Sequence, residues 1–240
     1  MQLSGKTALV TGGTDGIGAE LIRQLRAKGV TVITQGRNAE RVAATHAAGF
    51  EVIAADLSLP AGVRTLVDAV AGRTIDILIN NAGAGVDHDF RESAPDAEAA
   101  DGTIFLNLDA PIHLICALMP MLRSRPEAMI VNVTSGLAIA PRAGGPVYCA
   151  TKAGLRSYTQ ALRAQLKGTR VHVLEALPPV VETKMTAGRG SKKMQPAECA
   201  RQFVAAMERN ADEANVGLVK LLQVVHSISP ALARRIMLRF

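Results

Sequence analysis

A tyrosine and a lysine stand four residues apart in the segment VYCATKAGLRSY, residues 147–158, of a chain that contains only two tyrosines. In a helix, side chains at positions i and i+4 share one face, so Tyr148 and Lys152 would be neighbours. A nearby ammonium favours the phenolate and lowers the pKa of a tyrosine from its usual value of about 10 toward neutrality. The pair therefore predicts an acid/base catalyst, with an exposed helix that carries both residues by chance as the alternative.

Short apolar runs alternate with helical patterns along the chain, and these elements must position the pair. The runs that read as buried strands lie at residues 7–11, 31–34, 51–55, 75–80, 129–134 and 170–176. The helical patterns lie at residues 17–29, 39–49, 62–72, 96–123 and 147–167. Strands that alternate with helices indicate a parallel sheet with helices on both faces.

This alternation predicts an α/β fold, a Rossmann-type doubly wound parallel sheet of six to seven strands. Such a sheet binds its ligand at the carboxyl ends of the strands. The 240 residues fit a single dinucleotide-binding and catalytic domain, residues 1–240, and show no repeat and no interdomain linker.

A glycine-rich segment, TGGTDGIG, follows the first strand directly and opens a helix. Its glycines, Gly12, Gly16 and Gly18, permit a tight turn and a close approach of the backbone to a pyrophosphate. The start of the helix adds unpaired N–H groups and the positive end of a dipole. The segment predicts a dinucleotide-phosphate site, and a turn that only caps the strand is the alternative.

Composition limits the class of protein. Hydrophobic residues make up 48% and charged residues 20% of the chain, which is typical of globular domains. No segment is expected to be long and apolar enough to span a membrane, and the N-terminus lacks the pattern of a signal peptide, so we expect a cytoplasmic protein. The three cysteines lack C-x-x-C spacing, so neither a disulfide framework nor a metal site is predicted.

The net charge of +6 and the pI near 9.5 raise the question of an acidic partner. The basic residues are spread along the chain, and only 3% of residues are aromatic, which leaves little surface for stacking bases. The sequence therefore argues against a nucleic-acid partner.

Five motifs in a fixed order extend these inferences. They are the glycine turn, NNAG at residues 80–83, Asn107, VTSG around Ser135, and Tyr148 with Lys152. Together they make nearly the whole chain resemble the short-chain dehydrogenase/reductase family. Residues 147–166 and the segment PPVVET, residues 178–183, resemble the subgroup named for D-alanine esterification of teichoic acids.

The resemblance implies a role for each catalytic residue. Tyr148 would exchange a proton with the substrate oxygen, and Lys152 would lower the pKa of Tyr148 and hydrogen-bond the nicotinamide ribose. Ser135 would hold the substrate oxygen. Asn107 would help position a water in the proton relay, or else it is an ordinary helix residue beside Pro111.

The resemblance and the strand ends also assign the cofactor contacts. The residues expected to bind the cofactor are Gly12, Thr14, Asp15, Gly16, Ile17, Gly18, Arg37, Asp56, Leu57, Asn81, Ala82, Gly83, Tyr148, Lys152, Pro178, Val181 and Thr183. The chain departs from the family where Pro179 replaces the usual glycine, and the fixed φ of this proline should stiffen the loop.

The residues after the second strand address the choice of nicotinamide. Enzymes that prefer NAD generally place an acid there, whereas this chain has TQGRN with Arg37. A guanidinium suits a 2′-phosphate by charge and bidentate geometry, so NADP(H) is favoured. NAD(H) stays open, with Arg37 then an exposed residue at a helix start.

Two segments remain outside the motifs. A basic substrate lid is expected at about residues 184–198, with Lys184, Arg189, Lys192 and Lys193. An apolar and basic tail is expected at about residues 216–240, where Leu218, Leu221, Leu222 and Val225 form a helical stripe and Leu232, Ile236 and Phe240 stand beside Arg234, Arg235 and Arg239. The tail suits peripheral contact with an anionic membrane, an oligomer interface or a cover for the protein's own core.

Two functions fit these features. The first is an NADP-dependent oxidoreductase that acts on a small-molecule carbonyl or alcohol and forms a homo-oligomer. The second is an NADP-binding sensor or scaffold with little turnover, which engages a partner or a membrane through its tail. The presence of Ser135, Tyr148 and Lys152 together favours the enzyme.

Overall fold

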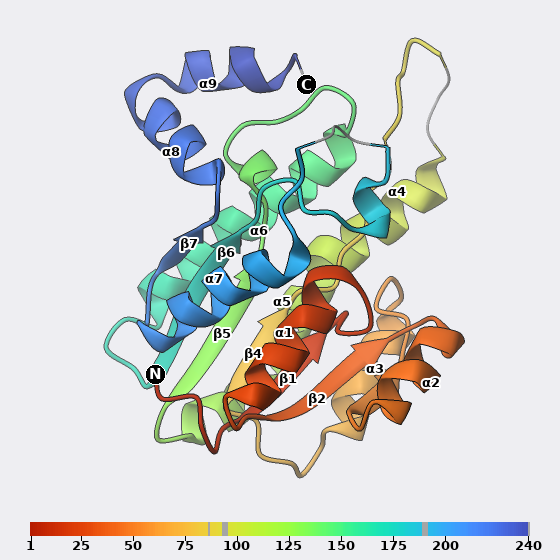
Figure 1. Ribbon diagram of the computed structural model, residues 1–240, viewed down its shortest axis with the longest axis vertical. Helices are drawn as coiled ribbons and strands as arrows, with labels where there is room; N and C mark the ends of the chain where they lie inside the picture. The colour runs from red at the N-terminus through yellow and green to blue at the C-terminus, as the bar shows by residue number, and fades with distance from the viewer. Residues whose placement is uncertain (86, 93–95, 189–191, 240) are drawn as a thin grey trace.

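The computed structural model describes residues 1–85, 87–92, 96–188 and 192–239. Seven parallel strands form one sheet in the order β3-β2-β1-β4-β5-β6-β7 (Figure 1). The strands are β1 (Thr7–Thr11), β2 (Thr31–Gly36), β3 (Glu51–Ala54), β4 (Ile77–Asn80), β5 (Ala128–Val133), β6 (Val171–Leu177) and β7 (Glu213–Asn215). The predicted α/β class and the Rossmann-type doubly wound sheet are confirmed.

Helices connect the strands, and two more helices follow the last strand. They are α1 (Gly16–Ala27), α2 (Ala39–Ala47), α3 (Pro60–Ala69), α4 (Ala97–Ile104), α5 (Ala110–Ser124), α6 (Pro146–Gln165), α7 (Pro196–Glu208), α8 (Val219–Ile228) and α9 (Pro230–Met237). A π-helical turn, Phe105–Asp109, joins α4 to α5. Short 3-10 turns lie at Gly136–Ala138 and Lys184–Thr186.

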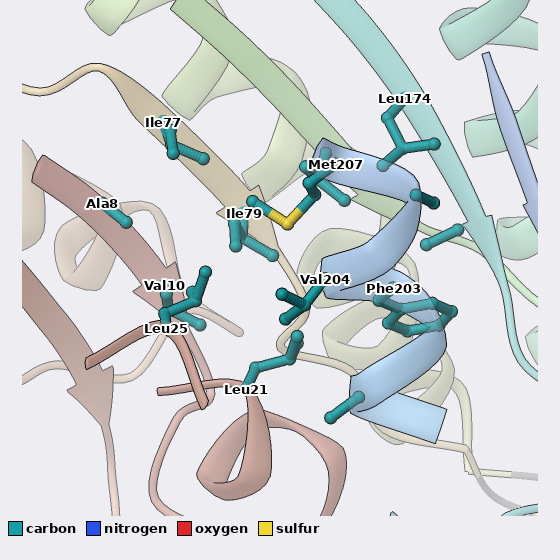
Figure 2. Close-up of a cluster of buried hydrophobic side chains, with 14 of the residues drawn as sticks. Ala8, Val10, Leu21, Leu25, Ile77, Ile79, Leu174, Phe203, Val204 and Met207 are labelled. Atoms are coloured by element: carbon teal, nitrogen blue, oxygen red, sulfur yellow. The ribbon is translucent and has the colours of Figure 1, made fainter. Parts of the chain in front are cut away.

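One side of the sheet packs against α1 and α7, which lie in front of it in Figure 1. Figure 2 shows Leu21 and Leu25 of α1 with Val204 and Met207 of α7 over the strand residues of this cluster, such as Val10. All of these side chains are buried, so the two helices close this layer of the core.

The opposite side of the sheet forms a second core. Leu9 lies between Ala8 and Val10 in β1 but belongs to the other cluster, because successive side chains of a strand point to opposite faces. Leu66 of α3 and Leu114 of α5 are buried in this second cluster. Burial on both faces explains why the central strands are apolar throughout.

The strand order reverses at β1, which lies between β2 and β4. In an open parallel sheet, the crevice for a ligand forms at such a reversal, outside the carboxyl ends of the strands. The glycine turn after β1, the end of β2 and the loop after β4 therefore meet at one place.

Two sequence expectations need correction. The predicted lid reached residue 198, but α7 begins at Pro196. The stretch Ala97–Ser124 is long and apolar enough for a membrane span, contrary to our expectation. Part of its apolar character has a structural cause in this fold, since Leu114, Leu118 and Leu122 are buried against the sheet.

The first core depends on α7, which leads to a prediction. Phe203 is 1% exposed and packs in the cluster of Figure 2. We expect Phe203→Ala to lower the free energy of unfolding by about 3–5 kcal/mol, because it removes buried apolar area and leaves a cavity. Urea denaturation measures the change. Leu59→Ala is the control, since Leu59 is 56% exposed, and an equal loss in both variants would contradict this account of the core.

Candidate functional site

A cavity of about 480 Å³ opens at the reversal of the strand order. The predicted site residues that line it are Gly12, Thr14, Asp15, Gly16, Ile17, Gly18, Arg37, Asp56, Leu57, Asn81, Ala82, Gly83, Ser135, Tyr148, Lys152, Pro178, Val181 and Thr183. The fold thus brings together segments that are more than a hundred residues apart in the chain.

The glycine turn has the shape that a dinucleotide phosphate requires. Gly12 and Gly16 adopt φ values of 67° and 53°, a left-handed conformation that favours glycine. A Cβ at Gly12 would lie 2.9 Å from Cα of Ala82, and a Cβ at Gly18 would lie 2.1 Å from the carbonyl oxygen of Gly12. Side chains at these two positions would collide with backbone, so only glycine allows this close packing of the turn. The turn leads into the start of α1, where unpaired N–H groups fit a pyrophosphate.

Asp15, which is expected among the cofactor contacts, also caps that helix. Its side chain accepts a hydrogen bond from the N–H of Gly16 over 2.8 Å, and it also forms an ion pair with Arg41. The capping bond stabilises the first turn of α1 beside the phosphate cradle.

Polar residues that sequence reasoning missed hold the turn in place. The Gly12 N–H donates to Oε1 of Gln35 over 3.1 Å, and the Gln35 amide donates to the carbonyl of Ala55. Gln35 therefore links the glycine turn to β2 and to the end of β3. The available signal in the sequence was a glutamine at the end of the otherwise apolar run TVITQG.

The NNAG segment packs directly on the glycine turn. The Asn81 side chain donates to the carbonyls of Thr11 and Gly12 over 2.9 and 3.2 Å. The hydroxyl of Thr11 accepts from the N–H groups of Asn81 and Ala82, each over 3.0 Å. These four bonds fix the loop after β4 against the turn after β1, and sequence reasoning had given Thr11 no part in them.

Two arginines stand where β2 ends. Nη1 of Arg37 lies 3.4 Å from a carboxylate oxygen of Asp56, and Arg41 pairs with Asp15. Both arginines line the cavity, and sequence reasoning had named only Arg37. Burial raises the pKa of Asp56, but hydrogen bonds from Ser58 and the Arg37 charge outweigh it, so the pKa lies below its ordinary value.

Tyr148 and Lys152 lie one turn apart on α6 and both line the cavity, as their spacing predicts. Nζ of Lys152 lies 5.8 Å from the centroid of the Tyr148 ring and donates to the carbonyl of Val133 over 2.9 Å. Lys152 is only 4% exposed, and burial lowers its pKa from 10.5 to about 8. The hydrogen bond to the Val133 carbonyl thus holds the ammonium inside the wall of the cavity.

Gly85 makes room for the tyrosine, a role that sequence reasoning missed. A Cβ at Gly85 would lie 2.8 Å from Cδ2 of Tyr148. The ring therefore packs against bare backbone, and any side chain at Gly85 would displace it. Because the residue lies two positions beyond NNAG, the motif itself did not reveal it.

Ser135 follows β5 and starts the turn Gly136–Ala138. Its hydroxyl oxygen accepts from the N–H of Leu137 over 3.1 Å, which orients the side chain at the cavity wall. Because its oxygen accepts from the backbone, the hydroxyl proton can be directed to another acceptor.

Asn107 lies behind the cavity wall rather than on it. The side-chain oxygen accepts from the Ala84 N–H over 3.0 Å, and the amide donates to the Ala84 carbonyl and the Thr151 hydroxyl over 2.8 and 3.1 Å. These bonds fasten the loop after β4 to the π-turn and to α6. The part expected of Asn107 in a proton relay stays a prediction.

The loop after β6 closes the other side of the cavity. Val181 bridges to Met194, with the Met194 N–H donating to the Val180 carbonyl over 3.0 Å. Pro178 accepts from the N–H of Gly136 over 3.1 Å, which ties the loop to the turn after Ser135. Of the expected lid, Lys184 lines the cavity, whereas Arg189 lies outside the described residues.

A buried ion pair supports the catalytic elements from behind, and sequence reasoning did not identify it. The Glu175 carboxylate of β6 accepts from the Thr134 hydroxyl and from Arg156, each over 2.7 Å. Burial raises the pKa of Glu175, against the lowering influence of these two partners. Arg156 also donates to Glu213 over 3.2 Å, so one guanidinium links α6 to β6 and β7.

Comparisons with known proteins agree with this geometry. The family described as short chain dehydrogenase matches residues 6–194. The chain is 39% identical over 198 residues to the uncharacterized oxidoreductase DltE of Bacillus subtilis (strain 168). This alignment covers 76% of this chain and 74% of that protein. It is 31% identical to an NADP-dependent 3-hydroxy acid dehydrogenase of Schizosaccharomyces pombe, over 82% of this chain and 80% of that one.

A solved structure extends the similarity to the whole chain. A short chain dehydrogenase from Burkholderia cenocepacia J2315, in complex with NADP, superposes with a TM-score of 0.88 at 27% identity and covers 99% of each chain. The sheet order, the glycine cradle, the placement of Ser135, Tyr148 and Lys152, and these comparisons lead to one conclusion. The chain belongs to the short-chain dehydrogenase/reductase family of NAD(P)-dependent oxidoreductases.

Proposed function

We propose that this protein is an NADP-dependent oxidoreductase that interconverts a carbonyl compound and a secondary alcohol, with Tyr148 as the acid/base group. The observation that carries the proposal is the shared cavity: Ser135, Tyr148 and Lys152 line the same space as the glycine turn. A sensor without turnover has no need of an acid/base pair at that place.

Each side chain has a definite task. When bound, the nicotinamide supplies or accepts the hydride at the substrate carbon. In reduction, the Tyr148 hydroxyl donates its proton to the carbonyl oxygen, so that the product is an alcohol, and in oxidation it takes this proton back. The Ser135 hydroxyl donates a hydrogen bond to the same oxygen. The Lys152 charge stabilises the phenolate of Tyr148.

Two cations support the choice of NADP. Arg37 and Arg41 line the cavity at the end of β2, where the strand carries no acid. Guanidinium groups bind phosphate through paired charged hydrogen bonds. The solved relative from Burkholderia cenocepacia, which is in complex with NADP, is in keeping with this choice.

The acid/base role of Tyr148 is tested by Tyr148→Phe. We expect hydride transfer to fall at least about 100-fold, because the proton donor is removed, while NADPH binding is retained. Stopped-flow absorbance with a panel of ketones and aldehydes measures the first effect, and calorimetry measures the second. Tyr158→Phe, which changes the second tyrosine of the chain on the same helix, is the control. Full turnover in Tyr148→Phe would exclude the mechanism, and NADPH binding with no turnover by the wild type would favour the sensor.

The cofactor preference is tested at the two arginines. We expect Arg37→Ala and Arg41→Ala each to weaken NADPH binding about 10-fold, because each removes a charged hydrogen bond to the 2′-phosphate, and to leave NADH binding nearly unchanged. Calorimetric titration with both nucleotides gives the ratio of affinities. Arg23→Ala on the exposed side of α1 serves as the control. Equal losses for NADPH and NADH would remove the assignment of the 2′-phosphate site.

The buried charge of Lys152 should lower the free energy of unfolding. Its folded pKa of about 8 lies below the unfolded 10.5, so the full cost of burying the charge is present below pH 8 and declines as the pH rises from about 8 toward 10.5. We expect Lys152→Met to abolish hydride transfer but to raise the free energy of unfolding by about 2 kcal/mol at pH 7.

The gain from Lys152→Met should shrink in denaturation curves recorded at increasing pH above 8. Lys167→Met is the control, because Lys167 is exposed beyond the end of α6. A variant less stable than the wild type at pH 7 would contradict the view that this buried charge is destabilising.

A further inference from the structure

The outward side of α8 is apolar. Leu221, Val224 and Ile228 are 61%, 54% and 80% exposed, and their spacing puts them on one side of the helix. Val219 and Leu222 face the other way, toward Gly136. The stripe expected from the sequence is therefore divided, with Leu222 turned inward and Leu221 outward.

The following helix, α9, adds cations to apolar side chains. Leu232, Arg235 and Arg239 recur at helical spacing and are exposed, whereas Ala233 on the inner side is buried. The two helices contact each other and lie together beyond the end of β7 (Figure 1). We call the exposed side chains of this helix pair the tail face. Its members are Leu218, Lys220, Leu221, Val224, Ile228, Leu232, Arg234, Arg235, Ile236, Leu238 and Arg239.

The charge of the tail face has one sign. Glu213 is the last acidic residue of the chain, and Lys220, Arg234, Arg235 and Arg239 follow it. Apolar side chains interspersed with cations suit the boundary of an anionic bilayer, where the apolar groups enter the headgroup region and the cations meet lipid phosphates. We propose that the tail face docks this protein on an anionic membrane surface.

The same charge argues against a second copy of the chain as the occupant. A two-fold interface brings the same patch of both copies together. Cations of the tail face would then meet cations, with no acid after Glu213 to pair with them. A membrane of anionic lipid supplies the opposite charge.

The inner side of α8, opposite the tail face, adjoins the catalytic elements. A Cβ at Gly136, the residue after Ser135, would lie 2.9 Å from a methyl carbon of Val219. The N-terminal turn of α8 therefore packs on the turn that begins with Ser135. Docking and turnover are separate properties, and the docking proposal does not depend on the proposed function.

Cosedimentation of the full chain with vesicles tests the proposal. The vesicles are phosphatidylcholine alone or an equimolar mixture with phosphatidylglycerol, each at low and high salt. We expect binding to the mixed vesicles at low salt, weaker binding at high salt, and little binding to phosphatidylcholine. Arg234→Gln with Arg235→Gln should weaken binding about 30-fold, at roughly fivefold for each cation lost near the surface. Arg64→Gln with Lys167→Gln, the same loss of charge at exposed sites elsewhere, should leave binding nearly unchanged.

A second variant tests the apolar part. Leu221→Ser with Ile228→Ser should also lose vesicle binding, and because both side chains are exposed, its unfolding curve should match that of the wild type. Failure of the wild type to bind mixed vesicles, equal binding to both vesicle types, or equal loss in the Arg64 and Lys167 control would overturn the proposal. If the wild type ignores vesicles and the serine variant dissociates an oligomer, the tail face is an interface between copies.

Discussion

The catalytic end of the molecule depends on one buried charge. Lys152 carries its ammonium into the wall between β5 and the loop after β4, where the Val133 carbonyl accepts its hydrogen bond. Removing a cation from water is costly, and the lowered pKa of Lys152 expresses that cost. The loop after β4 also passes close to this charge, since a Cβ built at Gly83 would lie 3.4 Å from Nζ of Lys152 and 3.1 Å from the side-chain oxygen of Asn107.

The helix α6 unites the parts of this site. Tyr148, Lys152 and Arg156 follow one another at intervals of four residues, so they lie along one side of the helix. The first is the proposed acid/base group, the second is the buried cation, and the third binds Glu175 over 2.7 Å. Since Glu175 also accepts from Thr134, the residue before Ser135, a single buried carboxylate joins α6 to the strand that leads to Ser135.

Apolar side chains are buried differently in the tail helices and in the sheet. In the strands, alternate side chains enter two separate cores, so nearly every apolar residue is buried. In α8, apolar side chains divide between an inner side that packs on the turn after Ser135 and an outer side that is exposed, and α9 likewise buries Ala233 and exposes Leu232. The exposed side carries the cations, and the proposal of membrane docking rests on this combination.

The α/β sheet, the phosphate turn and the pair Tyr148 and Lys152 could be predicted from the sequence, because strand–helix alternation, glycine spacing and helical spacing are local properties. The sequence did not reveal the contacts of Arg41 with Asp15, of Gln35 with Ala55 or of Arg156 with Glu175, because the partners lie 19 to 26 residues apart along the chain. It also did not place the Asn107 side chain behind the wall or divide the tail stripe. Those features depend on how α6, α8 and the strands pack against one another, which no local pattern of residues specifies.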